Sequence, residues 1–270
     1  MNEKNSYLVK APLIGFHEVE VGRKIADCEF GFEHGQYFFS TIVNADDQEK
    51  AKQKGELRLQ QVLSVFTIHT GISYTYDAIR VDQISGEQPF LHSSHMVLVG
   101  RTYLPLGKEK IEQIEKSLEV LSKLPNQEKS TKRVDRAINY YLRGCYLETQ
   151  WSSESFLNFF KVIELVSQDF AESYLHMVNS QLKGTLLKDL TLEETEKLRT
   201  QKRLVRFACE QLGITEVDNI SRIVEQRAKF SAHATLREII VSSEEFNNCK
   251  ALAGRIIINY LNHTQTVVEN

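Results

Sequence analysis

An arginine and a histidine six residues apart form the most concentrated chemistry in this chain. The segment reads Arg227-Ala-Lys-Phe-Ser-Ala-His233. An imidazole titrates near neutral pH, so His233 could take a proton from a ribose 2′-hydroxyl or give one to the leaving 5′-oxygen. A guanidinium binds phosphate and stabilises the charge that develops on it, which is the role we expect for Arg227. Neither role needs a metal or a cofactor, and we expect none.

Arg227 also interrupts an apolar stripe. A helix is predicted from a cap at Asp218, and position 227 falls on the next turn of its apolar face. The apolar residues of that face are Ile220, Ile223 and Val224. A guanidinium on a core-facing position needs a partner, because burying an unpaired charge is costly. The sequence therefore predicts a polar partner on a neighbouring helix.

Helical geometry limits how Arg227 and His233 can meet. Side chains six residues apart point in directions about 120° apart on an ideal helix. They converge on one point only if the helix ends or distorts around Ser231 to His233. Ser231 is small and would let another helix or another chain approach closely. Lys229 could contact an RNA phosphate or could remain a solvated lysine.

The residues from 126 onward predict an all-α bundle. Apolar residues recur at helical spacing in five segments, with little strand signal between them. These segments begin near Thr131, Ser152, Thr191, Asp218 and Ser242. Thr191 and Ser242 each precede acidic residues and resemble helix N-caps, and Gly213 is expected to end the third helix.

The residues before that point predict a smaller α+β domain. Aromatic and β-branched residues indicate strands, and two stretches have helical periodicity. The strands are expected at 36–43, 72–81 and 95–103, and the helices at 46–70 and 108–124. We predict an α+β domain at 1–125 that ends in a connecting helix, followed by the all-α bundle at 126–270.

Basic and aromatic residues near the start of the bundle are candidate RNA contacts. Lys132, Arg133 and Arg136 lie close together in the first predicted helix, and Tyr140 follows one turn later. The cations could bind phosphate and the tyrosine could stack on a base. The alternatives are a solvated helical face for the cations and ordinary packing for the tyrosine.

The composition is that of an ordinary globular protein. The 270 residues carry a formal charge of −3 and are 41% hydrophobic and 26% charged, so no overall basic field demands nucleic acid. No stretch has the length and apolar content of a membrane span, and the N-terminus has no secretory pattern. The four cysteines are scattered, without metal-ligand spacing. We expect a reduced, cytoplasmic protein with no membrane partner.

The Arg227 segment resembles the arginine, four to six residues, histidine motif of the HEPN superfamily, in particular its Apea-like branch. The resemblance covers about Lys129 to Leu261. It includes Phe159-Phe-Lys-Val-Ile-Glu-Leu165, which is similar to an aromatic-then-Leu/Ile-Glu pattern on an early helix of that branch. Glu164 falls beside the apolar stripe of its helix and is the predicted partner of Arg227.

The resemblance implies a helical bundle that forms a homodimer, with two copies of the motif meeting across the interface. Many such proteins are metal-independent endoribonucleases of antiviral defence, toxin or RNA-processing systems. Others have lost activity and serve as interaction modules. The chain departs from the pattern at Ala228, where a polar residue, often Asn, is common.

Two functions therefore stay open. The first is RNA cleavage, with Arg227 and His233 as catalytic residues. The second is a non-catalytic dimerisation or sensing module, whose N-terminal domain binds an activating ligand or a protein partner.

Overall fold

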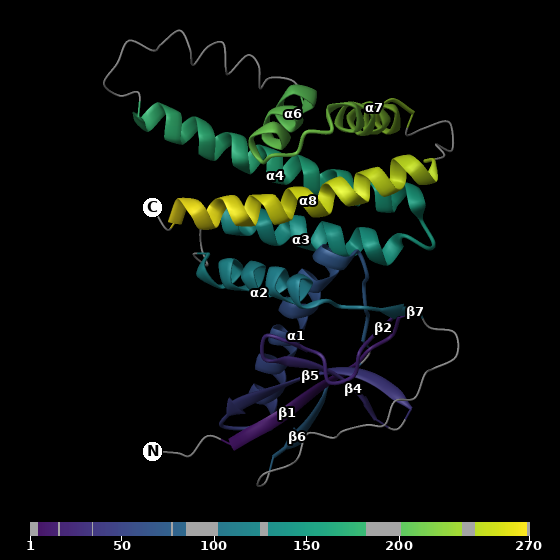
Figure 1. The fold of residues 1–270 in the computed structure, drawn as a ribbon, viewed down its shortest axis with the longest axis vertical. Helices are drawn as coiled ribbons and strands as arrows, with labels where there is room; N and C mark the ends of the chain where they lie inside the picture. Colours follow the sequence, from purple (N-terminus) through teal and green to yellow (C-terminus); the bar gives the residue numbers. More distant parts are fainter. Residues whose placement is uncertain are drawn as a thin grey trace. The chain divides into compact units, whose positions relative to one another are not determined.

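The chain divides into two compact units, Met1–Glu119 and Val120–Asn270. The computed structural model describes residues 5–15, 17–33, 35–76, 78–84, 102–124, 129–181, 201–233 and 241–268. The first unit contains the β-sheet and the second is helical, which confirms the predicted order of a sheet-containing region before a helical one. Figure 1 follows the chain through both units, and the division between them falls within α2 (Lys108–Lys123).

An antiparallel five-stranded sheet organises the first unit. Its strands, in the spatial order β3-β4-β5-β1-β6, are Lys24–Ile25, Cys28–Glu33, Gln36–Ala45, Asn5–Pro12 and Arg80–Gln83. A separate parallel pair joins β2 (His17–Val19) to β7 (Thr102–Leu104). In β1, Tyr7, Val9 and Ala11 are buried at every second position, so one face of this strand lies in the core.

Helix α1 (Gln48–Thr70) packs against the sheet. Its first turn is capped by the side chain of Asp47, which accepts a hydrogen bond from the Lys50 N–H at 2.8 Å. Its last turn is closed by Gly71, whose φ of 71° lies in the left-handed region that glycine adopts easily. Both ends agree with the predicted helix. A Cβ at Gly55 would lie 2.5 Å from Val9, so only glycine allows α1 to approach β1 this closely.

The strand predicted at 72–81 is wrong over most of its length. Only Arg80–Gln83 forms a strand, and the earlier part has a single isolated bridge between Ile14 and Thr75. Tyr74 instead packs within 5.9 Å of Phe66, measured between ring centroids, and donates a hydrogen bond to the His17 carbonyl. Its aromatic character therefore reflects core packing. The strand predicted at 95–103 lies outside the described residues as far as 101, and β7 agrees with its end.

The described part of the second unit contains the five predicted helices. They are α3 (Lys129–Leu147), α4 (Ser152–Gln181), α6 (Gln201–Gln211), α7 (Val217–His233) and α8 (Ser243–Val268). Helix α4 contacts all four of the others, and Figure 1 shows it alongside α3 and α8. Asp218 lies in the first turn of α7, so its prediction as the cap is wrong. The predicted helix start at Thr191 lies outside the described residues.

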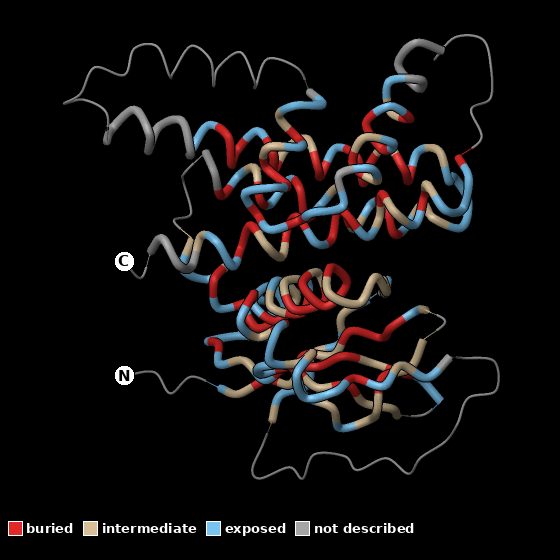
Figure 2. The backbone as a smooth tube through the Cα atoms, turned by 45° about the horizontal axis from the view of Figure 1, so that its top comes forward, coloured by how far each residue is buried: buried red, intermediate tan, exposed pale blue. Residues whose placement is uncertain are grey.

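Close packing joins α3 to α4 as an antiparallel pair. A Cβ at Gly144 would lie 2.6 Å from the Phe159 ring, so the glycine lets the two helices approach. The Ser155 hydroxyl donates a hydrogen bond of 2.6 Å to the Gly144 carbonyl, and the Tyr141 and Phe159 rings are 5.2 Å apart. Figure 2 shows the buried stripes that run along these helices. Together these contacts fix which residues of α3 face which residues of α4.

Helix α8 begins at a capping box, in which Ser242 and Glu245 each accept a hydrogen bond from the other's backbone N–H.

All four cysteines are buried and free, and burial raises the thiol pKa of Cys28, Cys145 and Cys209 to about 12. Those three thiols therefore stay protonated at neutral pH. None of the helices described here has the length and apolar character needed to cross a membrane.

Candidate functional site

Arg227 lies at the edge of the buried stripe of α7, because Gln226 is the buried residue of that turn. Ile220, Ile223 and Val224 on the preceding turns are buried, while the Arg227 side chain keeps 31% of its surface exposed. Its Nε lies 3.9 Å from Oε1 of Glu164 on α4, so the predicted pairing of these two residues is present. That distance is an ion pair without a hydrogen bond.

An aromatic ring supports the guanidinium of Arg227. Its Cζ lies 5.8 Å from the centroid of Phe160, a fully buried residue one turn before Glu164. A cation over an aromatic ring is attracted electrostatically by the ring's quadrupole. Among the residues that the structure describes, none accepts a hydrogen bond from Arg227.

Glu164 is half-buried between two cations. Burial raises the pKa of its carboxyl, and the positive charges of Arg227 and Lys161 oppose that rise. Since Lys161 is three residues earlier on α4, Glu164 connects the surroundings of Arg227 with a second set of polar side chains.

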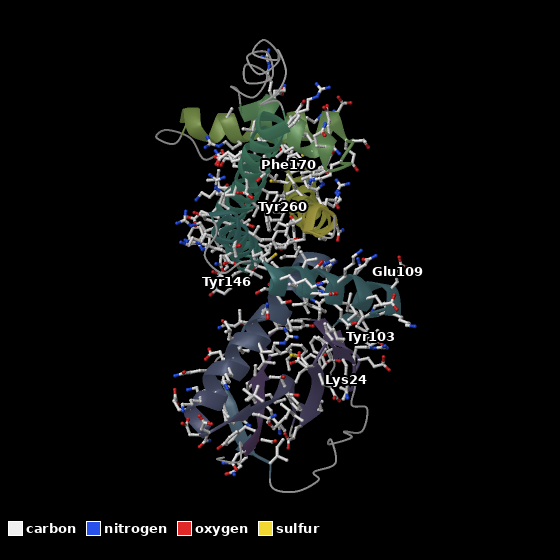
Figure 3. The ribbon with its side chains drawn as sticks, turned by 90° about the vertical axis from the view of Figure 1, so that its left-hand side faces the viewer. Lys24, Tyr103, Glu109, Tyr146, Phe170 and Tyr260 are labelled. Atoms are coloured by element: carbon white, nitrogen blue, oxygen red, sulfur yellow. The ribbon has the colours of Figure 1, made fainter. Side chains whose placement is uncertain are left out.

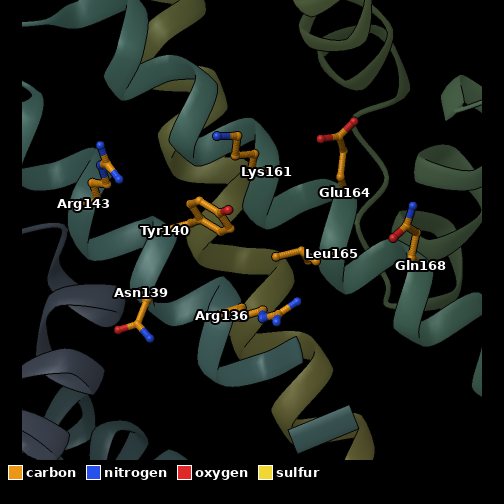
Figure 4. A pocket seen from close by; sticks show the side chains of 8 residues that line it. All are labelled: Arg136, Asn139, Tyr140, Arg143, Lys161, Glu164, Leu165 and Gln168. Atoms are coloured by element: carbon orange, nitrogen blue, oxygen red, sulfur yellow. The ribbon is translucent and has the colours of Figure 1, made fainter. Parts of the chain in front are cut away.

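That second set lines a cavity of about 640 Å³ between α3 and α4, shown in Figure 4. Four residues come from each helix, and both sets have the spacing i, i+3, i+4 and i+7, which places each set on one helical face. The lining residues are Arg136, Asn139, Tyr140, Arg143, Lys161, Glu164, Leu165 and Gln168. We refer to this cavity as the α3/α4 groove.

Positive charge exceeds negative charge in the groove. Three cations, Arg136, Arg143 and Lys161, face the single carboxylate of Glu164, which leaves a surplus of two positive charges. Neither Arg136 nor Arg143 forms an ion pair within the part of the chain that the structure describes. Lys161 places its Nζ 5.0 Å from the centroid of the Tyr140 ring. The groove therefore presents unneutralised cations beside an aromatic ring.

Arg133, a predicted RNA contact, has a different place. Its guanidinium donates two hydrogen bonds of 2.9 Å to Glu172 and one of 3.2 Å to Asp169. Asp169 is buried and also accepts a hydrogen bond from the hydroxyl of Tyr260 on α8, a residue labelled in Figure 3. The hydrogen bond that Arg133 donates to Glu172, above all, raises the pKa of Arg133. Arg133 thus links α3 to α4 and is already neutralised.

The other predicted residues are distributed as follows. Arg136, Tyr140 and Glu164 come together in the groove, whereas Lys132 is exposed on α3 and does not line it. Helix α7 is continuous through His233, after which the described residues resume at 241, so it shows no break between Arg227 and His233. The side chains of Lys229, Ser231 and His233 lie outside the described residues.

Arg143, Lys161, Asn139 and Gln168 are groove residues that the sequence analysis did not single out. Each helix carries a signal that could have identified them, a polar row at helical spacing beside the apolar stripe. Such a row is ordinary for one solvated helix. It becomes a candidate site only when two rows face each other, and that depends on how α3 packs against α4.

Within the described part of the chain, no group of three or more His, Cys, Asp or Glu side chains could hold a metal ion. Comparisons with protein-family models, with curated proteins and with solved structures found no match to this chain. What the site can do must therefore be argued from its own residues.

Proposed function

We propose that this protein is a metal-independent endoribonuclease of the HEPN type, with Arg227 and His233 as its catalytic residues. The observation that supports this most is the placement of Arg227. A guanidinium held over Phe160 and beside Glu164, with its N–H donors unused by the described residues, is suited to binding a phosphate.

The reaction would be a transesterification within the RNA backbone. A general base removes the proton of the 2′-hydroxyl, and the 2′-oxygen attacks the adjacent phosphorus. The bond from phosphorus to the 5′-oxygen breaks, and that oxygen takes a proton from a general acid. The products are a 2′,3′-cyclic phosphate and a free 5′-hydroxyl. His233 would act as the base or the acid, and Arg227 would stabilise the extra negative charge on the phosphate.

In this proposal the active unit is a homodimer, in which the motifs of two copies share one cleft. Six residues along a continuous helix separate the directions of Arg227 and His233 by about 120°. A second copy would place additional Arg227 and His233 side chains beside the first pair. The RNA and the second copy are the partners that this function requires.

Cleavage of single-stranded RNA in the presence of EDTA tests the proposal. The wild-type protein should release fragments that end in a 2′,3′-cyclic phosphate, and His233→Ala should abolish cleavage without lowering the melting temperature. Arg227→Ala should reduce the rate about 100-fold or more, since it removes a donor to the developing charge. Its unfolding free energy should fall by no more than about 1 kcal/mol.

Arg222→Ala is the matched control, because Arg222 is an exposed arginine of the same helix that lies outside this site. It should cleave at the wild-type rate. Intact RNA with the wild-type protein, under all conditions including added candidate activators, would contradict the enzymatic function.

A non-catalytic dimerisation or sensing module is the second candidate. The contact of Arg227 with Glu164 and Phe160 favours it, because the same contact can simply neutralise an arginine at the core edge. In that case neither the wild type nor Arg227→Ala would cleave RNA. The substitution would change the stability or the oligomeric state, the latter measured by analytical ultracentrifugation.

A further inference from the structure

The α3/α4 groove is a cavity that catalysis by Arg227 and His233 does not itself use. We infer that it binds the sugar-phosphate backbone of single-stranded RNA and guides the strand toward Arg227. This inference names the substrate form and its binding surface, and it rests on the proposed function.

The charge of the groove suits an anionic ligand. Arg136 and Arg143 are exposed and make no ion pair with a described residue, so phosphate oxygens can reach both guanidinium groups. Their surplus charge contrasts with a protein of formal charge −3 overall. A local cationic row on an acidic chain selects an anion at one place without making the whole surface bind polyanions.

The groove combines cations with an aromatic ring. Tyr140 is half-buried and Lys161 lies 5.0 Å from its ring centroid. Proteins that bind single strands combine a positive groove with rings on which bases stack. Asn139 and Gln168 add amides that can donate to or accept from base edges and ribose hydroxyls. A duplex buries its bases, so this combination favours a single strand.

The length and position of the row of cations also suit a strand. Arg136 and Arg143 are seven residues apart, which corresponds to about 10 Å along α3. The row is therefore long enough to contact more than one phosphate of a strand. Glu164 lines the groove and also lies 3.9 Å from Arg227, so one side chain adjoins both the groove and the proposed catalytic arginine.

Binding of a short fluorescent 2′-O-methyl oligouridine, which has no nucleophilic 2′-hydroxyl and cannot be cut, tests the inference. Fluorescence anisotropy should show that Arg143→Glu and Lys161→Glu each raise Kd about tenfold or more, and that Arg143→Gln and Lys161→Gln reduce the salt dependence of log Kd by about 0.7 each. Arg222→Glu, an equal charge change outside the groove, should bind like the wild type. Circular dichroism should confirm that each variant is folded.

Several results would overturn the inference: no binding by the wild type, unchanged Kd in the groove variants, or equal weakening by Arg222→Glu. A change in oligomeric state at unchanged Kd would also overturn it, because the groove would then be an interface between copies. A DNA duplex that binds more tightly than the single strand would exclude the proposed ligand.

The two proposals fail separately. If the wild type binds through the groove but never cuts RNA, the catalytic proposal fails and the groove assignment stands. If the wild type and both groove variants cut and bind alike, the groove assignment fails and catalysis stands.

Discussion

Two polar regions of the same helix pair, α3 and α4, have opposite charge balance. Around Arg133 the single guanidinium meets the carboxylates of Asp169 and Glu172, and Tyr260 donates to the first of these. One turn further along α3, in the groove, three cations face one carboxylate. A charge whose partners are already within the chain contributes to structure, whereas a surplus charge is available to a ligand. Residue type and spacing along the sequence do not show that Arg133 is paired within the chain and Arg136 is not.

The largest effect should come from breaking the balanced region. Asp169→Ala leaves the Tyr260 hydroxyl without its acceptor and removes the buried carboxylate beside Arg133. Removing one partner of a buried charge pair costs about 3 kcal/mol of unfolding free energy. Urea unfolding followed by circular dichroism measures this loss. Glu172→Ala is the control, since that carboxylate is half-exposed and should cost less than about 1 kcal/mol. Equal losses in the two variants would contradict the contrast drawn between a buried and an exposed partner.

A much smaller effect is expected in the groove. Arg136→Gln and Arg143→Gln should each change the unfolding free energy by no more than about 0.5 kcal/mol, because neither side chain is buried or paired with a described residue. The same urea titration applies. If either variant loses as much stability as Asp169→Ala, the groove arginines are structural and the comparison between the two regions fails.

The smallest effect should be the pH dependence contributed by Glu164. Burial raises its carboxyl pKa from the ordinary value of 4.5, so the folded state holds this proton more tightly than the unfolded state does. The stability that this proton provides is present below pH 4.5 and is lost as the pH rises through the raised pKa.

Glu164→Gln cannot lose that proton, so its melting temperature relative to the wild type should increase over the same pH window. Melting curves at a series of pH values measure the difference. A difference between the two proteins that is constant with pH would show that Glu164 is not buried as described. The effect should grow in an Arg227→Ala background, because the positive charge of Arg227 opposes the rise in pKa.

The sequence was most informative where local rules apply. Asp47 and Gly71 at the ends of α1, and Ser242 before α8, occupy caps that depend on residues within one turn. The same reasoning failed for 72–81. Tyr74 packs against Phe66, a residue of α1 that no local pattern relates to it, so its aromatic side chain does not indicate a strand.

The candidate site divides in the same way. Helical periodicity in the sequence shows that Arg227 interrupts an apolar stripe. The cost of burying charge then predicts a polar partner for it, such as Glu164. Arg133 is neutralised, whereas Arg136, Arg143 and Lys161 are not. This difference depends on the register of α3 against α4. The contact of Gly144 with Phe159 sets that register, and it joins residues that only packing brings together. Side-chain periodicity is a property of one helix, but a groove is a property of two.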